Sequence, residues 1–115
     1  MRSSQEFADF VIDQIASAGD VGFRKMFGSY AIYCDKKVVA LICDNQLFVK
    51  PTSSGRKYIG EVIEAPPFKK ARNFFLITEK IEDSDWMTGL IKITTEELPL
   101  PKIKPKRAKL PNPIF

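Results

Sequence analysis

Residues 29–50 read SYAIYCDKKVVALICDNQLFVK, and this stretch decides the fold. Tyr30, Ile32 and Cys34 stand at every second position, and Val38, Ala40 and Ile42 follow with the same spacing. A period of two predicts β-strands that bury one face. Asp35-Lys36-Lys37 and Asp44-Asn45-Gln46 separate the apolar runs, and short polar segments of this kind are typical of hairpin turns. The stretch therefore predicts an antiparallel meander whose last strand is 47–50.

Segments with helical spacing flank this meander on both sides. Before it, an apolar stripe follows Ser3 and Glu6, which have the spacing of a capping box, so we expect a helix over about residues 4–18. After it, a weaker stripe through 58–63 predicts a second helix that begins at 51–54 and ends at Pro66-Pro67. Asp83 or Ser84 can cap a last helix, which should stop by Leu98 because Pro99 disfavours helical geometry there.

Two further segments have strand character: 23–27, which precedes Gly28, and 74–78, which is rich in aromatic and β-branched residues. The fold class that we predict is α+β. An antiparallel sheet of about five strands, with a central meander, should carry the N-terminal and the C-terminal helix packed on it. A chain of 115 residues is long enough for one such domain with its own core.

The end of the sequence differs from the rest in composition. Residues 99–115 hold five of the eight prolines and no acid. Their cations are Lys102, Lys104, Lys106, Arg107 and Lys109. Because the whole chain carries +4, residues 1–98 carry a net charge of −1. We therefore predict a nearly neutral folded domain over 1–98 and an extended basic tail over 99–115, whose Ile114 and Phe115 dock on the body or on a neighbouring chain.

The composition limits the chemistry. Without histidine the chain has no Ser-His-Asp or Cys-His pair and no histidine-bound zinc. No secretory leader or membrane-spanning run is visible, so we expect a cytoplasmic protein in which Cys34 and Cys43 stay reduced and inert. The acidic run 82–85 is interpreted as a complement to the dipole of the last helix rather than as a metal site. We expect no catalytic residue, metal or other cofactor.

Two groups of cations are candidates for binding nucleic acid or a partner. The first is Arg24 and Lys25, followed by the candidate structural residues Met26, Phe27, Gly28 and Tyr30. The second is Lys69, Lys70 and Arg72, with Phe68 and Phe74 beside them and with Arg56 and Lys57 as further members. Cations next to an exposed ring suit phosphate contact and base stacking. The alternative is that both groups are solvated surface, and the tail cations would add only a nonspecific anchor for polyanions.

The stretch RKMFGSYAIY at 24–33, continued by VALI at 39–42, LFVK at 47–50 and Pro67-Phe68, resembles the TfoX (Sxy) N-terminal domain family. The resemblance covers about residues 5–95 and implies the same fold. We expect a stand-alone N-terminal domain, without the C-terminal TfoX domain. Family members with both domains are associated with the regulation of natural competence, in which they act with a transcription activator.

Three functions therefore compete. The first is a non-enzymatic, TfoX-like regulatory or adaptor domain, which contacts a protein such as a transcription factor or polymerase component and binds nucleic acid weakly and without sequence preference. The second is a small-molecule or enzymatic domain, which would need a pocket with converging polar groups. The third is a homodimeric scaffold formed by exchange of a strand or of the tail.

Overall fold

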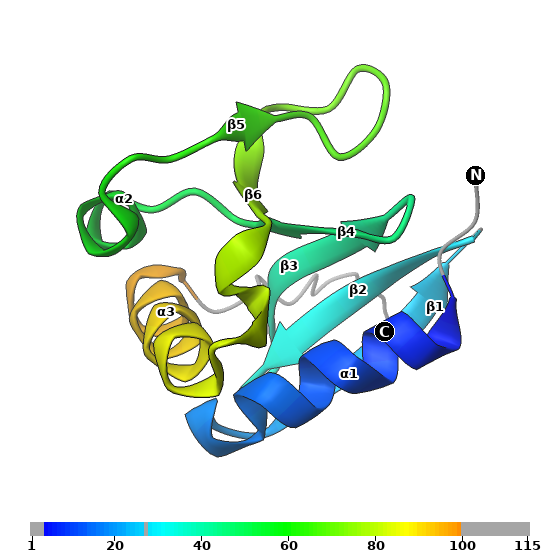
Figure 1. Ribbon diagram of the computed structural model, residues 1–115, viewed down its shortest axis with the longest axis horizontal. Helices are drawn as coiled ribbons and strands as arrows, with labels where there is room; N and C mark the ends of the chain where they lie inside the picture. The colour runs from blue at the N-terminus through cyan, green and yellow to red at the C-terminus, as the bar shows by residue number, and fades with distance from the viewer. Residues whose placement is uncertain (1–3, 27, 100–115) are drawn as a thin grey trace, which may run out of the picture.

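An antiparallel sheet of six strands runs through the protein (Figure 1). The computed structural model describes residues 4–26 and 28–99. The strands are β1 (Val21–Met26), β2 (Ser29–Cys34), β3 (Lys37–Cys43), β4 (Gln46–Val49), β5 (Glu64–Ala65) and β6 (Phe74–Ile77). Their order across the sheet is β1-β2-β3-β4-β6-β5, so β1 and β5 form its two edges. The predicted α+β class and the meander β2–β3–β4 are confirmed.

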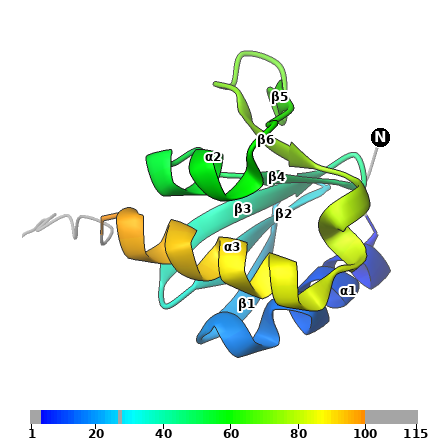
Figure 2. The same cartoon turned by 60° about the vertical axis from the view of Figure 1, so that its left-hand side comes forward.

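The helices of the described ranges lie on one face of this sheet (Figure 2). They are α1 (Gln5–Ile15), α2 (Ser53–Ile59) and α3 (Ser84–Glu97), with 3₁₀ turns η1 (Ala16–Ala18) and η2 (Glu79–Glu82). The buried stripes of α1 and α3 join the sheet in one apolar core. Gly55 brings α2 onto the same core, because a Cβ built on it would lie 3.5 Å from the Phe75 ring and 3.7 Å from Leu90. The expected packing of the first and last helices on the sheet is therefore confirmed.

The two turns of the meander have the backbone geometry that tight hairpins need. Asp35 and Lys36 have φ of 51° and 70°, and Asp44 and Asn45 have φ of 57° and 55°. Positive φ at both central residues is the type I′ pattern, whose twist matches that of the flanking strands. Each turn therefore uses two residues of the predicted three-residue separator, and the third begins the next strand.

The ends of α1 and α3 follow from their capping residues. Asp83 Oδ1 accepts from Trp86 N at 3.1 Å, and α3 stops at Leu98 as expected. The predicted capping box at Ser3 was wrong by one residue, because Ser4 Oγ accepts from Phe7 N at 3.2 Å. Ser4 is held in this extended position by its own N–H, which donates to Asn45 Oδ1 at 2.8 Å.

The predicted second helix is shorter than expected, and its predicted last turn is partly a strand. Gly60 has φ 88° and ends α2, since its N–H donates back to Arg56 O at 2.9 Å. Ile63 O then accepts from Leu76 N at 2.8 Å, and β5 pairs with β6. The stripe through 58–63 fits a helix, but its later residues find their partner on a strand about ten residues further along the chain.

Strand register sorts the sheet into two faces. One row of paired residues faces the helices: Phe23, Ile32, Ala40, Val49 and Phe75. The adjacent row faces away from them: Arg24, Ala31, Leu41, Phe48 and Leu76. We call this second side the helix-free face, because no helix of the described ranges lies on it. Side chains of alternate residues point to opposite faces, so each row continues across five strands.

A polar seam joins α1 to α3 beside the core. The carbonyl of Gln14 accepts hydrogen bonds from Ser84 Oγ at 2.9 Å and from Thr88 Oγ1 at 3.1 Å. The Gln14 amide in turn donates to Ile81 O at 2.9 Å. The two hydroxyl bonds satisfy the Gln14 carbonyl near the C-terminal end of α1, a helix that has no basic residue in its last turn.

Candidate functional site

The stretch from Arg24 to Tyr30 forms the β1–β2 hairpin, and only part of it serves the fold. Tyr30 is 2% exposed, and its ring meets Phe23 edge to face with centroids 5.2 Å apart. Gly28 has φ 84°, a conformation that favours glycine. Phe27 lies outside the described residues. Tyr30 and Gly28 are therefore explained by packing and backbone geometry.

The other residues of this stretch are at the surface, but they do not form one patch. Arg24 and Met26 extend from the helix-free face, whereas the intervening Lys25 points to the helix side. All three are exposed, and Met26 retains 38% of its surface. Within the described part of the chain neither cation forms an ion pair. Their charges are therefore available to a partner.

A shallow cleft of about 360 Å³ lies beside Arg24 at the β1 edge. Gly22, Tyr33 and Lys36 line it together with Arg24, and Asp20 lies at one end. A Cβ on Gly22 would meet no atom within 4 Å, so the floor of the cleft is open above this residue. The cleft combines an aromatic ring, two cations and one carboxylate.

The second predicted group of cations lies on the loop between β5 and β6. Lys69, Lys70 and Arg72 are all exposed there, and Phe68 retains 58% of its surface. Lys70 has φ 73°, and Ala71 N donates to Phe68 O at 3.1 Å, which closes a turn. Phe74, which was expected beside these cations, is the first residue of β6 and is half-buried. The loop presents one ring and three cations to solvent.

The two groups of cations do not come together. Arg24 and Lys25 are on one edge strand, and the β5–β6 loop projects from the opposite edge (Figure 1). Arg56 is exposed but already paired within the domain, since it lies 2.8 Å from Glu64 and 5.3 Å from the centre of the Phe75 ring. The tail cations, Ile114 and Phe115 are outside the described residues.

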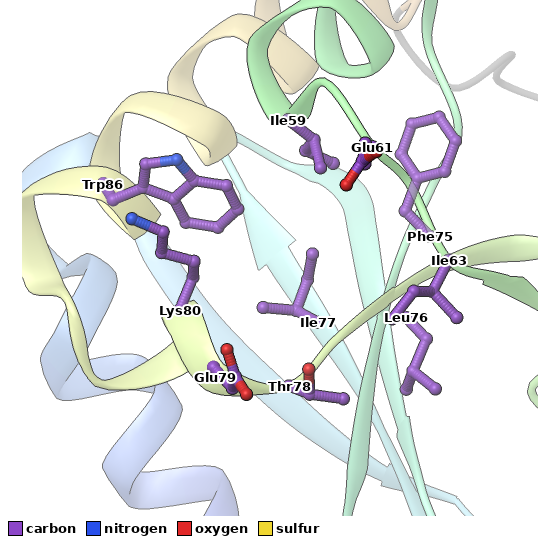
Figure 3. Close-up of a pocket in the computed structure, with 10 residues that line it drawn as sticks. All are labelled: Ile59, Glu61, Ile63, Phe75, Leu76, Ile77, Thr78, Glu79, Lys80 and Trp86. Atoms are coloured by element: carbon purple, nitrogen blue, oxygen red, sulfur yellow. The ribbon is translucent and has the colours of Figure 1, made fainter.

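Sequence reasoning missed a cleft of about 460 Å³ between α2, β6 and α3 (Figure 3). Ile77 forms part of its apolar wall, with Trp86 and Lys80 on one side and Ile63 on the other. Lys80 Nζ lies 5.8 Å from the Trp86 ring centre. The cleft was missed because 62–65 were assigned to a helix, whereas Ile63 directly precedes β5 and keeps 53% of its surface exposed.

Close approach of α2 and α3 shapes this cleft. Tyr58 Oη donates to Trp86 O at 2.9 Å, and the two rings are 5.5 Å apart. Gly89 permits the contact, because a Cβ there would overlap the Tyr58 hydroxyl group. Burial, followed by the charges of Asp83 and Asp85, raises the pKa of Tyr58. The tyrosine thus serves as a hydrogen-bond donor in its neutral form.

A carboxylate at the end of α3 holds the start of α2. Glu97 accepts from Ser53 N and Ser54 N, each at 2.9 Å. These bonds lower the pKa of Glu97 below its usual value. Thr52 Oγ1 accepts from Gly55 N at 2.9 Å, so the first turn of α2 is capped both from within and from α3.

The two cysteines are buried free thiols. Burial raises the pKa of Cys34, and the nearby Asp35 and Asp20 act in the same direction. A thiol with a raised pKa is a poor nucleophile near neutral pH. Cys34 pairs with Lys37 at one hairpin, whereas Cys43 pairs with Gln46 at the next, so each belongs to a different turn. The interpretation of both as packing residues is supported.

Residues 4–26 and 28–99 hold neither a group of side chains suited to a metal ion nor a helix suited to a membrane. There, no cluster of three or more cysteine or acidic side chains is placed to hold a metal ion. Nor do the helices of these ranges combine the length and apolarity that a bilayer requires. In the acidic run 82–85, Asp83 caps α3.

The α+β fold, with its meander and the β1–β2 hairpin, defines a small sheet domain covered by helices on one side. The family model of the TfoX N-terminal domain matches residues 13–98, and the chain belongs to this family. It is 34% identical over 113 residues to the "Uncharacterized 12.7 kDa protein in trpE 5'region" of Spirochaeta aurantia, a match that covers 98% of this chain and 96% of that protein.

A second relative is longer. "Protein Sxy" of Escherichia coli strain K12 is 26% identical over 83 residues. The match covers 68% of this chain but 38% of the E. coli protein. The similarity therefore concerns one part of that relative.

Proposed function

We propose that this domain is a non-enzymatic regulatory adaptor that works by contact with another protein. The observation that carries the proposal is the helix-free face with its row Arg24, Ala31, Leu41, Phe48 and Leu76. Four of these five residues are apolar. Leu41 and Leu76 are partly exposed, whereas Ala31 and Phe48 are buried. The exposed Met26 and the cleft beside Arg24 adjoin the row. A sheet face with apolar side chains and a charged margin suits a protein contact. The resemblance to competence regulators supports a role of this kind in the control of transcription.

Affinity capture with the full chain tests the proposal. Met26→Glu places a charge on the helix-free face, and Ile63→Glu makes the same change at an exposed position in the cleft of Figure 3. We expect a protein that is captured by the wild type and by Ile63→Glu but not by Met26→Glu. Capture of the same proteins by all three forms, or of none by the wild type, would contradict the proposal.

The β5–β6 loop supports an auxiliary function in binding single-stranded nucleic acid. Phe68 is the most exposed of the large apolar residues in the described ranges, and Lys69, Lys70 and Arg72 are exposed beside it. Stacking of a base on such a ring contributes about 1–3 kcal/mol, and contacts from cations to phosphate make affinity fall with salt.

Fluorescence anisotropy with labelled oligothymidine tests this loop. Phe68→Ala should weaken binding about tenfold or more, given that stacking energy. Phe10→Ala removes an exposed ring from α1 and should leave the affinity unchanged. Equal effects of both changes would exclude stacking on Phe68.

A further inference from the structure

The outer edge of β1 carries backbone groups that no other described residue uses. Asp35 N donates to Asp20 O at 2.9 Å, so this pair is a hydrogen-bonded pair of the β1–β2 ladder. Bonding alternates along an antiparallel ladder, which directs the backbone groups of Gly22, Arg24 and Met26 toward β2. The N–H and C=O groups of Val21, Phe23 and Lys25 therefore point outward. Residues 4–20 and 28–99 supply no partner for them.

This edge also lacks the features that normally prevent strands from pairing. β1 has six residues in continuous register with β2 and contains no proline. Its register with β2 shows no bulge. Proteins usually protect an exposed edge by shortening it or by using proline, bulges or charge. Of these devices β1 has only charge, and the sign of that charge selects what can pair with it.

Both charged side chains of β1 are cations. Arg24 lies on the helix-free face and Lys25 on the helix side, so an added strand would meet one positive charge on each of its faces. Lys36 adds a third cation in the cleft, and Asp20 places the one carboxylate of that cleft at the start of the strand. Arg24 and Lys25 thus place their charge toward the Met26 end of the edge, whereas Lys36 and Asp20 lie at the Val21 end.

From these observations we infer that β1 accepts an extended acidic segment of a partner protein as a seventh strand. The inference rests on the proposed adaptor function and specifies the chemistry of its partner. Main-chain bonds from Val21, Phe23 and Lys25 supply affinity, and acidic side chains next to Arg24 and Lys25 supply specificity. A side chain above Gly22 enters the open cleft beside Tyr33.

Charge disfavours the two occupants that the chain itself offers. Residues 99–115 contain five cations and no acid, so they repel Arg24 and Lys25. A second copy paired through β1 would place four cations side by side. Like charges that meet across strands are destabilising.

Hydrogen exchange followed by NMR on the full chain provides the first test. In the free protein the amides of Val21, Phe23 and Lys25 should exchange quickly and those of Gly22, Arg24 and Met26 slowly. Protection of the outward amides would overturn the inference, because the edge would already be occupied. Dependence of that protection on protein concentration would then identify a second copy as the occupant, and its absence would identify the tail.

The second test adds a synthetic heptapeptide of alternating glutamate and valine, capped at both ends. At saturation it should slow exchange of the three outward amides about tenfold, the effect of about 1.4 kcal/mol of protection. A peptide with lysine in place of glutamate should have no effect. Arg24→Glu should weaken binding of the acidic peptide roughly tenfold, whereas Lys92→Glu makes the same charge change on α3 and should leave it unchanged.

The remaining outcomes separate this inference from the adaptor proposal. If the acidic peptide fails to bind at millimolar concentration, binds elsewhere or binds no better than the lysine peptide, strand addition at β1 is wrong. Loss of capture by Met26→Glu would then still support a contact through the helix-free face. If the wild type captures no protein but the acidic peptide slows exchange of the outward amides, strand addition at β1 is supported and the proposed adaptor function is wrong.

Discussion

The two edges of the sheet differ in almost every property that controls strand pairing. β5 consists of two residues, is followed by Pro66-Pro67, and has its Glu64 carboxylate paired with Arg56. β1 has six residues, no proline, and two cations without an ion pair among the described residues. The fold closes the first edge, whereas in the part of the chain that the structure describes only charge protects the second. The acidic strand that we propose for β1 would therefore be excluded from the β5 edge.

The largest difference between the edges should be in stability. Phe75 and Phe23 stand at the two ends of one helix-facing row, but Phe75 is 1% exposed whereas Phe23 is only half-buried. Phe75→Ala should cost about 3–5 kcal/mol of unfolding free energy, because it opens a cavity in the core. Phe23→Ala should cost about 1–2 kcal/mol, in proportion to the smaller area buried. Equal losses in urea denaturation would show that β1 is anchored as firmly as β6.

Proline substitutions test the direction of the β1 backbone. Arg24→Pro removes an N–H that points to β2, and Lys25→Pro removes one that points outward. Both changes strain the strand, but Arg24→Pro should be worse by about 1–3 kcal/mol because it also leaves a buried acceptor without its donor. Thermal denaturation of the two variants makes the comparison. The opposite order would reverse the assignment of inward and outward groups.

The stability of the protein should depend on pH through the Glu97 carboxylate that holds the start of α2. Because the pKa of Glu97 is lowered in the folded protein, its carboxylate stabilises the fold above the ordinary glutamate pKa of about 4.3. That contribution is lost as the pH falls through the lowered pKa. Glu97→Gln should reduce the melting temperature at pH 7 and converge with the wild type in acid.

Glu96→Gln serves as the control for this prediction, because the neighbouring carboxylate is exposed and has no hydrogen bond to α2 among the described residues. The same pH dependence in both variants would show that the effect is general charge and not the cap. If Glu97→Gln and the wild type have the same melting temperature at pH 7, the Glu97 cap does not stabilise the fold.

The smallest effect is expected at the ion pair that covers the β5 edge. Arg56 and Glu64 retain 52% and 37% of their side-chain surface, so solvent screens their attraction. Glu64→Gln should cost about 0.2–1 kcal/mol, and the cost should shrink as salt is added. Glu61→Gln is the matched control. A loss well above 1 kcal/mol would show that β5 depends on this pair and is less securely closed than its length indicates.

Local signals in the sequence predicted most of the fold. Positive φ at Asp44 and Asn45 and the cap at Asp83 concern interactions within a few residues, and these elements were found close to their predicted limits. β5 was missed because its identity depends on β6, which lies on the far side of a loop. Apolar spacing at 62–63 satisfies a helix as well as a strand, and only the distant partner decides.

The candidate site was less accessible to sequence reasoning, for a related reason. Arg24 and Lys69 are both cations near aromatic residues, and nothing in their local sequence says that they occupy opposite edges. The strand order supplies this information. Because β6 lies next to β4 and β5 lies outside β6, the basic loop between β5 and β6 is at the opposite end of the sheet from β1. Similarly, the outward backbone groups of β1 have no partner among the described residues because of the position of this strand in the sheet and not because of its sequence.

The seam between α1 and α3 bears on how the chain folds during synthesis. The carbonyl of Gln14 receives its hydroxyl donors from residues 70 and 74 positions later. A nascent chain thus completes α1 and the whole meander long before α3 leaves the ribosome, and contacts so distant in sequence slow folding. During this interval the apolar stripe of α1 lacks the cover that α3 provides and is open to chaperones. We therefore expect translation of the last helix, rather than of the sheet, to be the step after which this domain can reach its native state.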